Sequence, residues 1–481
     1  MKGFAKLVSM LAIAALCFVA CGDDDDEDSS VLSFDVPALY LPGPGAEATV
    51  SFTAVGMDRL TITDKPVGWE DVELNATNHT IKIKVPQNLK IETMEEDKTP
   101  VEPVASGTII LQGTSYLGKI KSANIFVGVV ASKDMSDKPA NSYIVNDRNT
   151  HYTFATVKGD GTKINPKKVA PIWQTDTKLL QYICLDGDKV SFYTNVDGDQ
   201  LKEGNALLGA YDEEDNLIWS WHIWVTNYNP ESDVLAYQNG YEMMGRNLGA
   251  LNNANTTPAE RLASYGLYYQ WGRKDPFIGP NAYQANGGHE GAIYGENTNR
   301  VYTKLEETTV ENGTRAFADA HPLTFLVGTK ESSYDWLWTK DDQAWGERKG
   351  VNDPCPYGWK VAPRAAFDGL EIENAPKAED YDVFGLNLTD GTLTSLYMAG
   401  GRRVYNSGRF MNVYNPLPSR ANSAMEAQPW EGLYWTSNGL SDRKSASFYF
   451  WFEKKTTTTG LRNGVPHHRA NGLTLRCVKD R

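Results

Sequence analysis

The stretch Leu217-Ile218-Trp219-Ser220-Trp221-His222-Ile223-Trp224-Val225 decides the fold of the middle of the chain. Successive side chains of a β-strand point to opposite faces of the sheet, and here both faces carry large apolar groups. This pattern predicts a central strand that is covered on both sides. His222 lies among tryptophans, and no nucleophile or metal ligand stands at a useful spacing from it. We therefore expect His222 to be a core histidine with satisfied hydrogen bonds.

The segment before this strand predicts its hairpin partner. Residues 205–211 form a largely apolar run, and the acidic turn Asp212-Glu213-Glu214-Asp215-Asn216 joins the run to Leu217. Together with the segment Ala140–Val145, these strands predict a β-sandwich module over residues 140–230. The pair of segments Ala140–Val145 and Trp219–Trp224 resembles a module of cell-surface and fimbria-associated proteins of Bacteroides-type bacteria.

The preceding hundred residues also read as β structure. Short alternating or β-branched runs occur at Val50–Val55, Thr80–Val85, Gly107–Leu111 and Ala123–Val127, separated by clusters of Pro, Gly and Asn. Residues 32–131 therefore predict a β-sandwich, with Trp69 in its core. The order of its segments resembles the immunoglobulin-like BACON modules of Bacteroides surface proteins, and in that family the module often serves as a spacer.

Composition excludes some classes of partner. The chain has 481 residues, 61 Asp and Glu against 47 Lys and Arg, and a formal net charge of −14. Nucleic-acid binding requires a concentrated positive surface, so no nucleic-acid partner is expected. The same balance argues against docking on anionic lipid by charge alone. The length suits about three domains.

Residues 1–20 have the form of an export signal. Lys2 and Lys6 precede the apolar run Leu7–Ala20, which is shorter than the ~20 residues that a membrane span needs. The string Phe18-Val19-Ala20-Cys21 resembles the lipobox of bacterial lipoproteins, although leucine is usual at the position of Phe18. The resemblance implies lipidation of Cys21; the alternative is an ordinary secretory signal.

An acidic run follows Cys21. The residues Asp23-Asp24-Asp25-Asp26-Glu27-Asp28 repel one another, so residues 21–31 are expected to act as a solvated tether. The run also resembles the export signal of surface-displayed lipoproteins of Bacteroides-type bacteria. The resemblance implies an outer-membrane lipoprotein on the cell surface; a simple flexible spacer is the alternative.

The last half of the chain, residues 233–481, contains five ordered motifs. They are Met244–Ala250, Tyr265–Arg273, Asp353–Arg364, Tyr434–Ser437 and Leu475–Val478. This series resembles the Fibrobacter succinogenes major paralogous domain family, whose fold is similar to C-type lectins. The fold class expected for the whole chain is therefore two all-β modules followed by an α+β, C-type-lectin-like domain.

Local residue patterns support this interpretation. Thr257-Pro258-Ala259-Glu260 is a capping box with proline at the first helical position, which predicts a short helix. Cys355 and Cys477 are the two cysteines of the region, and in an exported protein such a pair predicts a disulfide. Cys184 is left as an unpaired, buried thiol.

Signals for enzymatic chemistry are weak. No nucleophile elbow, phosphate loop or dinucleotide fingerprint occurs, and both cysteines of the last region occupy structural positions. The pairs His289-Glu290 and His467-His468 lack a third ligand at zinc-site spacing. The nearest strings to lectin calcium triplets, Gln428-Pro429-Trp430 and Trp435–Asn438, lack the needed carboxylates. We expect no catalytic residue, metal or cofactor.

Two segments are candidates for ligand binding. The first is the long insertion from Pro280 to Lys349, with aromatic residues among Gly, Asn and Thr; its candidates are Tyr283, Tyr294, Tyr302, Trp336, Trp338 and Trp345. The second runs from Gly400 to Arg409 and includes Arg402, Arg403 and Tyr405. For each single aromatic residue, core packing is the alternative.

The sequence thus predicts a non-enzymatic, surface-exposed lipoprotein that acts as an adhesin or binds a glycan or protein ligand. The main alternative is an accessory or tip subunit of a fimbria, in which the β modules exchange strands with fimbrial subunits. A carbohydrate-active enzyme is the third possibility.

Overall fold

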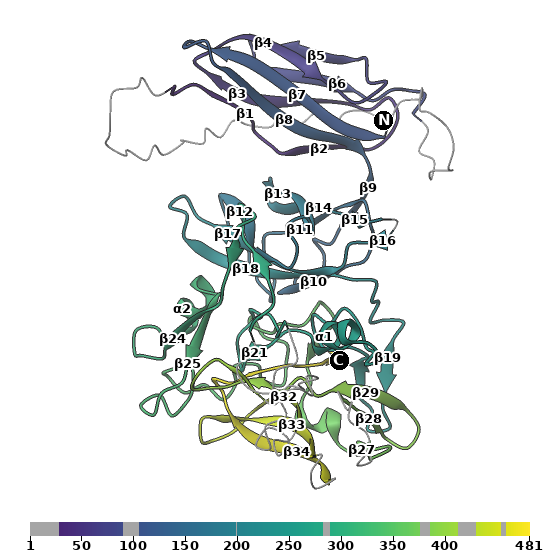
Figure 1. The fold of residues 1–481 in the computed structure, drawn as a ribbon, viewed down its shortest axis with the longest axis vertical. Coiled ribbons are helices and arrows are strands. Elements are labelled where there is room, and N and C mark those ends of the chain that lie inside the picture. Colours follow the sequence, from purple (N-terminus) through teal and green to yellow (C-terminus); the bar gives the residue numbers. More distant parts are fainter. Residues whose placement is uncertain are drawn as a thin grey trace, which may run out of the picture.

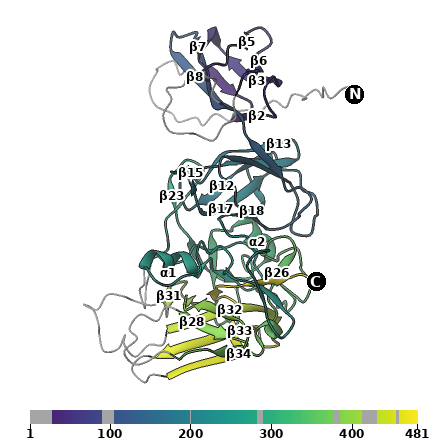
Figure 2. The same cartoon turned by 90° about the vertical axis from the view of Figure 1, so that its right-hand side faces the viewer.

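Sheets of different size follow one another along the chain in the computed structural model (Figure 1). The structure describes residues 28–89, 105–198, 200–281, 289–375, 385–411, 430–453 and 458–481. This part of the chain is mostly β-sheet, with two short α-helices. The first sandwich lies at one end and the sheet of the last long strands at the other, as Figure 2 also shows.

The amino-terminal unit is a sandwich of two four-stranded sheets, β1-β3-β6-β5 and β2-β8-β7-β4. Trp69 is completely buried in its core, as predicted. The four sequence runs that predicted strands lie in β3, β6, β7 and β8. The strands are β1 (Val31–Phe34), β2 (Ala38–Leu41), β3 (Glu47–Val55), β4 (Met57–Asp64), β5 (Val72–Asn75), β6 (Thr80–Lys84), β7 (Ser106–Ser115) and β8 (Ile120–Val129).

Aromatic rings join this sandwich to the next unit. Strand β8 is followed after one residue by β9 (Ala131–Asp134), which pairs in parallel with β11 (Thr150–Ala155) of the second unit. Tyr40 stacks on His151 with ring centroids 3.9 Å apart, and Phe126 stacks on Tyr182 at 4.6 Å. Cys184 is a free, half-buried thiol, and burial raises its pKa to about 11.

The second unit has the predicted central strand. Strand β18 lies between β10 and β17, and its two faces enter different cores, because Trp221 packs in one cluster and Trp224 in another. His222 is 1% exposed, and its two ring nitrogens lie within hydrogen-bonding distance of Ser142 and Asn205, so the core interpretation is confirmed. The strands are β10 (Ser142–Val145), β11 (Thr150–Ala155), β12 (Lys168–Gln174), β13 (Leu180–Asp186), β14 (Lys189–Thr194), β15 (Val196–Asp197), β16 (Gln200–Leu201), β17 (Gly204–Tyr211) and β18 (Leu217–Val225).

The sheet of β18 extends into the last region. Its order is β10-β18-β17-β12-β22-β23, in which β22 is Ile293–Tyr294 and β23 is Arg300–Val301. Gln174 of β12 pairs with Tyr294 of β22. The Asn141 side chain also donates to the carbonyls of Val351 (2.7 Å) and Asp353 (2.9 Å). The second unit and the last region therefore bury a common core rather than sitting on separate ones.

The last region contains both α-helices. Helix α1 (Pro258–Tyr265) begins with the predicted capping box, in which Thr257 and Glu260 cap each other. No helix among the described residues is long and apolar enough to cross a membrane. The other elements are β19 (Val234–Ala236), β20 (Glu242–Met244), β21 (Tyr269–Gln270), β22 (Ile293–Tyr294), β23 (Arg300–Val301), β24 (Lys304–Glu307), α2 (Arg315–Ala320), β25 (Thr324–Val327), β26 (Trp359–Val361), a 3-10 helix (Arg364–Phe367), β27 (Glu371–Ile372), β28 (Gly385–Thr389), β29 (Thr394–Met398), β30 (Arg402–Arg403), β31 (Phe410–Met411), β32 (Trp430–Gly439), β33 (Lys444–Glu453), β34 (Thr458–His468), β35 (Gly472–Leu473) and β36 (Cys477–Lys479).

The five sequence motifs of this region meet in its core. Val361 of β26 pairs with Cys477 of β36, and the predicted disulfide between Cys355 and Cys477 is present. The Arg476 guanidinium is fully buried and donates to the side chain of Asn247 at 2.9 Å. Asn247, Cys355 and Val361, which are far apart in the sequence, are thereby linked to Arg476 and Cys477 at the beginning of the last strand, β36.

Candidate functional site

A short hairpin, β30–β31, forms one side of the small sheet β21-β35-β30-β31. Arg403 of β30 pairs with Phe410 of β31 and also with Gly472 of β35, which attaches the hairpin to the closing strands. Hydrogen bonds close the loop between the two strands. The amides of Ser407 and Gly408 donate to the Val404 carbonyl, and the Val404 amide donates to the Arg409 carbonyl. Gly408 has φ +63°, and a Cβ there would lie 2.5 Å from the Leu305 side chain, so the turn requires glycine.

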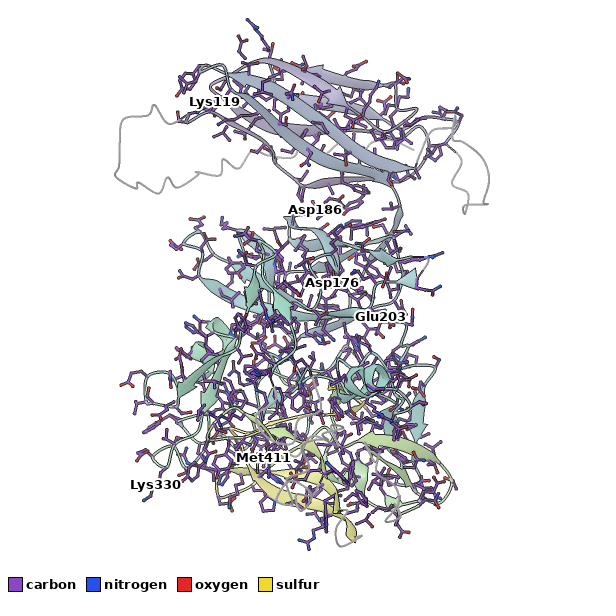
Figure 3. The ribbon with its side chains drawn as sticks, viewed as in Figure 1. Lys119, Asp176, Asp186, Glu203, Lys330 and Met411 are labelled. Atoms are coloured by element: carbon purple, nitrogen blue, oxygen red, sulfur yellow. A yellow bond between two sulfur atoms is a disulfide. The ribbon has the colours of Figure 1, made fainter. Side chains whose placement is uncertain are left out.

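Eight residues of the hairpin line a surface pocket of about 540 Å³, a size typical of ligand-binding sites. Its wall combines two arginines and three uncharged polar groups with apolar side chains, and no carboxylate belongs to it. Figure 3 labels one lining residue, Met411, in the lower half of the molecule. The lining residues are Arg402, Val404, Tyr405, Asn406, Ser407, Arg409, Phe410 and Met411.

Arg403 holds the hairpin from inside. Its side chain is 5% exposed, and its guanidinium lies 3.5 Å from the Glu290 carboxylate. The rings of Phe277, Phe325 and Phe410 surround it at 5.0–5.6 Å from their centroids. Burial lowers the pKa of this guanidinium to about 10, while Glu290 opposes the shift. The expectation that Arg403 faces a ligand is wrong, because neighbouring residues of a strand point to opposite sides and this one points inward.

Arg402 and Arg409 lie on the pocket side. The Arg402 side chain is 21% exposed and lies 3.4 Å from Glu431, which also accepts a hydrogen bond from the Tyr449 hydroxyl at 2.9 Å. The Arg402 Nε atom is buried and makes no hydrogen bond with the described residues. Arg409 is exposed and forms no ion pair within the described part of the chain. Arg409 therefore brings a cation without a counter-charge among the described residues to the pocket, while the charge of Arg402 is shared with Glu431.

Tyr405 is fixed in place by its neighbours. Its amide donates to the Asn471 side chain at 3.1 Å, and its carbonyl accepts from the Gly328 amide at 2.7 Å. Its ring packs against His468 at 4.4 Å and edge-on against Tyr334 at 5.0 Å. Tyr334 has φ +59°, which is rare for a bulky residue and marks backbone strain beside the pocket.

The candidate aromatics of the long insertion do not form one surface. Tyr283 lies outside the described residues. Tyr294 is half-buried in the shared sheet, where it pairs with Gln174 and Arg300. Trp338 is half-buried, and its carbonyl accepts from Arg443 at 2.9 Å.

Trp336 and Trp345 belong to the core, so the expectation that they bind ligand at the surface is wrong. Each is 1% exposed. The Trp336 indole donates to the carbonyl of Trp271 at 2.7 Å, and the Trp345 indole donates to the carbonyl of Asn352 at 3.1 Å. A buried indole whose N–H is satisfied is a packing element, which was the alternative for both residues.

The histidine pairs have other partners. His467 is within hydrogen-bonding distance of Ser447 at 2.9 Å, while His468 packs against Tyr405 on the other side of the strand. Burial lowers the pKa of His468, and its Nδ1 atom has no hydrogen-bond partner among the described residues. The Glu290 carboxylate forms an ion pair with Arg403. Within the described ranges no group of three or more His, Cys, Asp and Glu side chains could hold a metal ion.

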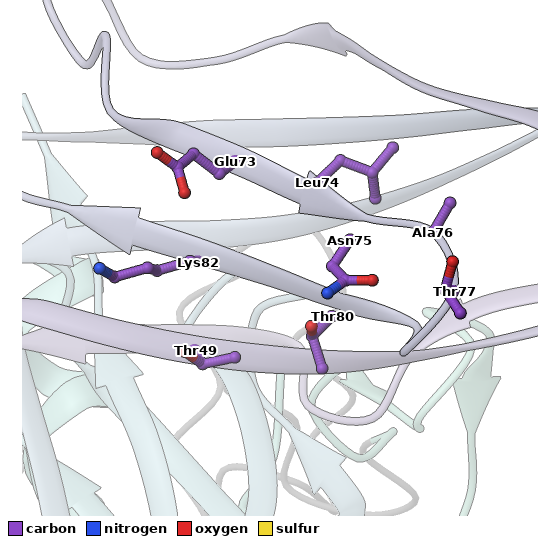
Figure 4. Close-up of a pocket in the computed structure, with 8 residues that line it drawn as sticks. All are labelled: Thr49, Glu73, Leu74, Asn75, Ala76, Thr77, Thr80 and Lys82. Atoms are coloured by element: carbon purple, nitrogen blue, oxygen red, sulfur yellow. The ribbon is translucent and has the colours of Figure 1, made fainter.

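A second pocket, of about 500 Å³, lies on the first sandwich, over β3, β5 and β6 (Figure 4). Its charges are matched within the protein, because Lys82 pairs with Glu47 at 3.1 Å and lies opposite Glu73 in the sheet. The lining residues are Thr49, Glu73, Leu74, Asn75, Ala76, Thr77, Thr80 and Lys82. With its charges paired, this face is a weaker candidate than the hairpin.

Sequence patterns indicated the hairpin as a candidate but not the whole pocket wall. Arg402 and Tyr405 were candidates, and they line the pocket together with the exposed Arg409. Phe410 and Met411 were not anticipated. The turn signal Ser407-Gly408 could have indicated a return strand that places them beside Arg402.

Comparisons with known proteins do not identify a family. No family model matches the chain, and no curated protein matches it. Among solved structures, an endo-fucoidan hydrolase of glycoside hydrolase family 107 is 15% identical over 40% of this chain and 32% of its own, with a TM-score of 0.14. The chain thus spans about a third of that enzyme's length.

Two further structures show equally distant likeness. The D00-D0 domain of intimin is 12% identical over 40% of this chain and 96% of its own, with a TM-score of 0.16. The SGBP-B protein of the Bacteroides ovatus mixed-linkage glucan utilization locus, solved with a mixed-linkage heptasaccharide, is 10% identical over 39% and 42%, with a TM-score of 0.11. TM-scores this low carry no conclusion about fold or function.

Proposed function

We propose that this protein is a non-enzymatic lipoprotein, anchored through Cys21 to the outer membrane and exposed on the cell surface, which binds a ligand with its carboxy-terminal, lectin-like half. The observation that carries the proposal is the hairpin pocket, where Arg402 and Arg409 stand beside Tyr405 and Asn406. Arginine guanidinium groups recognise carboxylate, sulfate and phosphate in planar, two-pronged geometry. The ligand is therefore a glycan or protein that presents such an anionic group.

The construction of the hairpin supports a binding role. A site that binds without large rearrangement needs side chains held by a rigid frame. Arg403 and Gly472 fix the base of the hairpin, while hydrogen bonds from Gly328 and to Asn471 fix Tyr405. The strained backbone at Tyr334 is the kind of feature that clusters at ligand sites.

The composition of the pocket argues against a glycosidase. Hydrolysis of a glycosidic bond uses two carboxyl groups that flank the bond. The eight lining residues include no Asp, Glu or His, and their only hydroxyl groups belong to Tyr405 and Ser407. Neither hydroxyl has a histidine or carboxylate base within the pocket wall, so this pocket has the chemistry of a binder.

The first sandwich favours a binding role over a strand-accepting fimbrial subunit. A subunit that receives a strand from its neighbour exposes part of its core until the strand arrives. Here Ile81, Ile83 and Ile109 are fully buried without a partner. This observation supports a closed spacer.

A screen of the mature, full-length chain tests the proposal. We expect it to bind sulfated or carboxylated glycans, or acidic host proteins, on broad arrays, with binding unchanged by EDTA because no calcium site is required. Loss of binding in EDTA would contradict the arginine-based site, and a blank screen together with co-purification of pilin subunits would favour the fimbrial alternative.

A further inference from the structure

Exposed apolar side chains gather at one end of the first sandwich. The described part of the chain has ten large hydrophobic residues that are strongly exposed, and half of them lie here. Monomeric soluble proteins rarely leave such side chains contiguous unless the surface contacts a partner or a membrane. The five residues, which we call the apolar tip, are Val31 (37% exposed), Val55 (57%), Tyr116 (61%), Leu117 (38%) and Ile120 (68%).

The strand register brings these residues together. Val31 of β1 pairs with Val55 of β3, and Ile120 pairs with Thr114 next to the turn that carries Tyr116. The Tyr116 amide donates to the Gly56 carbonyl at 3.2 Å, which joins the β3–β4 turn to the β7–β8 turn. The tip is thus one surface built from two turns and a strand end. Figure 3 labels Lys119, which belongs to one of these turns, at the left-hand end of the first sandwich.

The chain enters the sandwich at the same end. The Lys121 side chain lies 3.3 Å from the Asp28 carbonyl and 3.7 Å from its carboxylate, and the Ser29 hydroxyl lies 3.3 Å from that of Tyr116. Seven residue steps separate Asp28 from Cys21. At about 3.6 Å per residue, this length spans at most about 25 Å.

We propose that the apolar tip docks into the interfacial layer of the membrane to which the protein is anchored. The inference rests on the proposed lipid at Cys21, which would hold the tip within about 25 Å of the bilayer. Val, Leu and Ile side chains partition into the boundary between headgroups and acyl chains, while tyrosine prefers the headgroup level. The contact depends on apolar area, so it is compatible with the acidic net charge of the chain.

Docking would set the orientation of the whole protein. Strand β8 begins at Ile120 within the tip and ends at Val129, where β9 continues into the second unit. The stacked rings of Tyr40 and His151 fix the next unit to the sandwich. A docked tip therefore adds a second point of membrane attachment to the proposed lipid at Cys21. The hairpin pocket lies in the carboxy-terminal half of the chain.

An environment-sensitive fluorophore at position 117 tests the proposal. The lipidated full-length chain carrying Leu117→Cys and Cys184→Ser is labelled and reconstituted into phosphatidylcholine vesicles, with Val310→Cys as the matched exposed site. We expect blue-shifted emission and quenching by acyl-chain quenchers at position 117 but not at position 310. Water-like emission at both positions would overturn the proposal. Emission that is shielded from water but insensitive to lipid quenchers would do so as well, because a partner subunit or second copy would then cover the tip.

Vesicle flotation of the unlipidated Cys21→Ala chain separates docking from anchoring. We expect the triple variant Tyr116→Ser, Leu117→Ser and Ile120→Ser to lower its vesicle partition coefficient about tenfold, which corresponds to partial burial of three apolar side chains. The control triple variant Tyr302→Ser, Val310→Ser and Tyr357→Ser removes equally exposed residues elsewhere and should change nothing. Equal partition of both variants would overturn docking. Mass spectrometry of the native protein detects the acyl chain independently. A failure of the proposed lipid anchor can therefore be distinguished from a failure of docking.

Discussion

Replacing Arg403 by leucine should destabilise the carboxy-terminal half, whereas replacing Arg409 by leucine should not. The two residues lie in the same hairpin, but the Arg403 side chain is 5% exposed and Arg409 is exposed. Arg403 pairs with Glu290 at 3.5 Å and donates to the Gly408 carbonyl at 3.2 Å. The matched pair separates a buried guanidinium that holds the hairpin in place from an exposed one that lines the pocket.

The expected magnitude follows from these contacts. The Glu290 side chain is only 13% exposed, so losing its cation leaves a carboxylate poorly solvated. Removing one partner of a buried ion pair costs about 3–5 kcal/mol. The leucine keeps part of the apolar contact with the rings of Phe277, Phe325 and Phe410, so we expect the lower end of this range. An exposed arginine without an ion pair contributes less than about 0.5 kcal/mol.

Thermal unfolding followed by near-ultraviolet circular dichroism measures this difference. Eight of the 13 tryptophans lie in residues 233–481, so the signal reports mainly on this half. A loss of 3 kcal/mol should lower its melting temperature by roughly 10 °C. The Arg403→Leu protein melting within about 2 °C of the wild type, or the Arg409→Leu protein melting as low as Arg403→Leu, would refute the assignment.

Three other predictions address the disulfide, the core histidine and the anchor. The double substitution Cys355→Ser and Cys477→Ser opens a loop with a sequence separation of 122 and should cost about 4–5 kcal/mol in calorimetry; an unchanged melting temperature would show that the bond is dispensable. Burial lowers the pKa of His222 from 6.5 to about 3, so the unfolded chain takes up a proton first as the pH falls. The wild type should therefore lose about 3 kcal/mol more than His222→Gln between pH 7 and pH 4, and parallel pH profiles would contradict the buried neutral state. The Cys21→Ala protein should take up no palmitate in metabolic labelling, and continued labelling would exclude lipidation at that residue.

Local patterns predicted the parts of the fold that local physics determines. The alternating apolar residues around Trp221 predicted a strand covered on both sides, and the residues Thr257 and Glu260 predicted the start of α1. The disulfide followed from the number of cysteines. Each of these inferences needs only the two-residue period of a strand, the residues of a helix cap or the number of cysteines.

Long-range pairing could not be read from the chain. The second unit and the last region share a sheet through the pair Gln174 and Tyr294, which are 120 positions apart. Trp336 and Trp345 stand among polar loop residues, which favoured an exposed position. The carbonyls that satisfy their indoles belong to Trp271 and Asn352, and only the folded chain brings the first of these within reach.

The hairpin illustrates the same limit within two residues. Strand alternation implies that Arg402 and Arg403 point to opposite sides. It does not say which of them faces inward, because this choice depends on the rings of Phe277 and Phe325 and on the carboxylate of Glu290. The hairpin was thus predictable as a candidate segment, but which of its two arginines points inward was not.

The most direct test of the hairpin site is the affinity of the best ligand from the screen for three variants of the full-length protein. Arg402→Ala and Arg409→Ala each remove a charged contact and should weaken binding about 10–100-fold. Arg409→Ala should leave the melting temperature unchanged, whereas Arg402→Ala should lower it because the Glu431 carboxylate beside Arg402 is only 8% exposed. Lys330→Ala, an exposed cation outside the pocket wall, should bind like the wild type. Equal affinities for all three variants would contradict the claim that this pocket is the binding site.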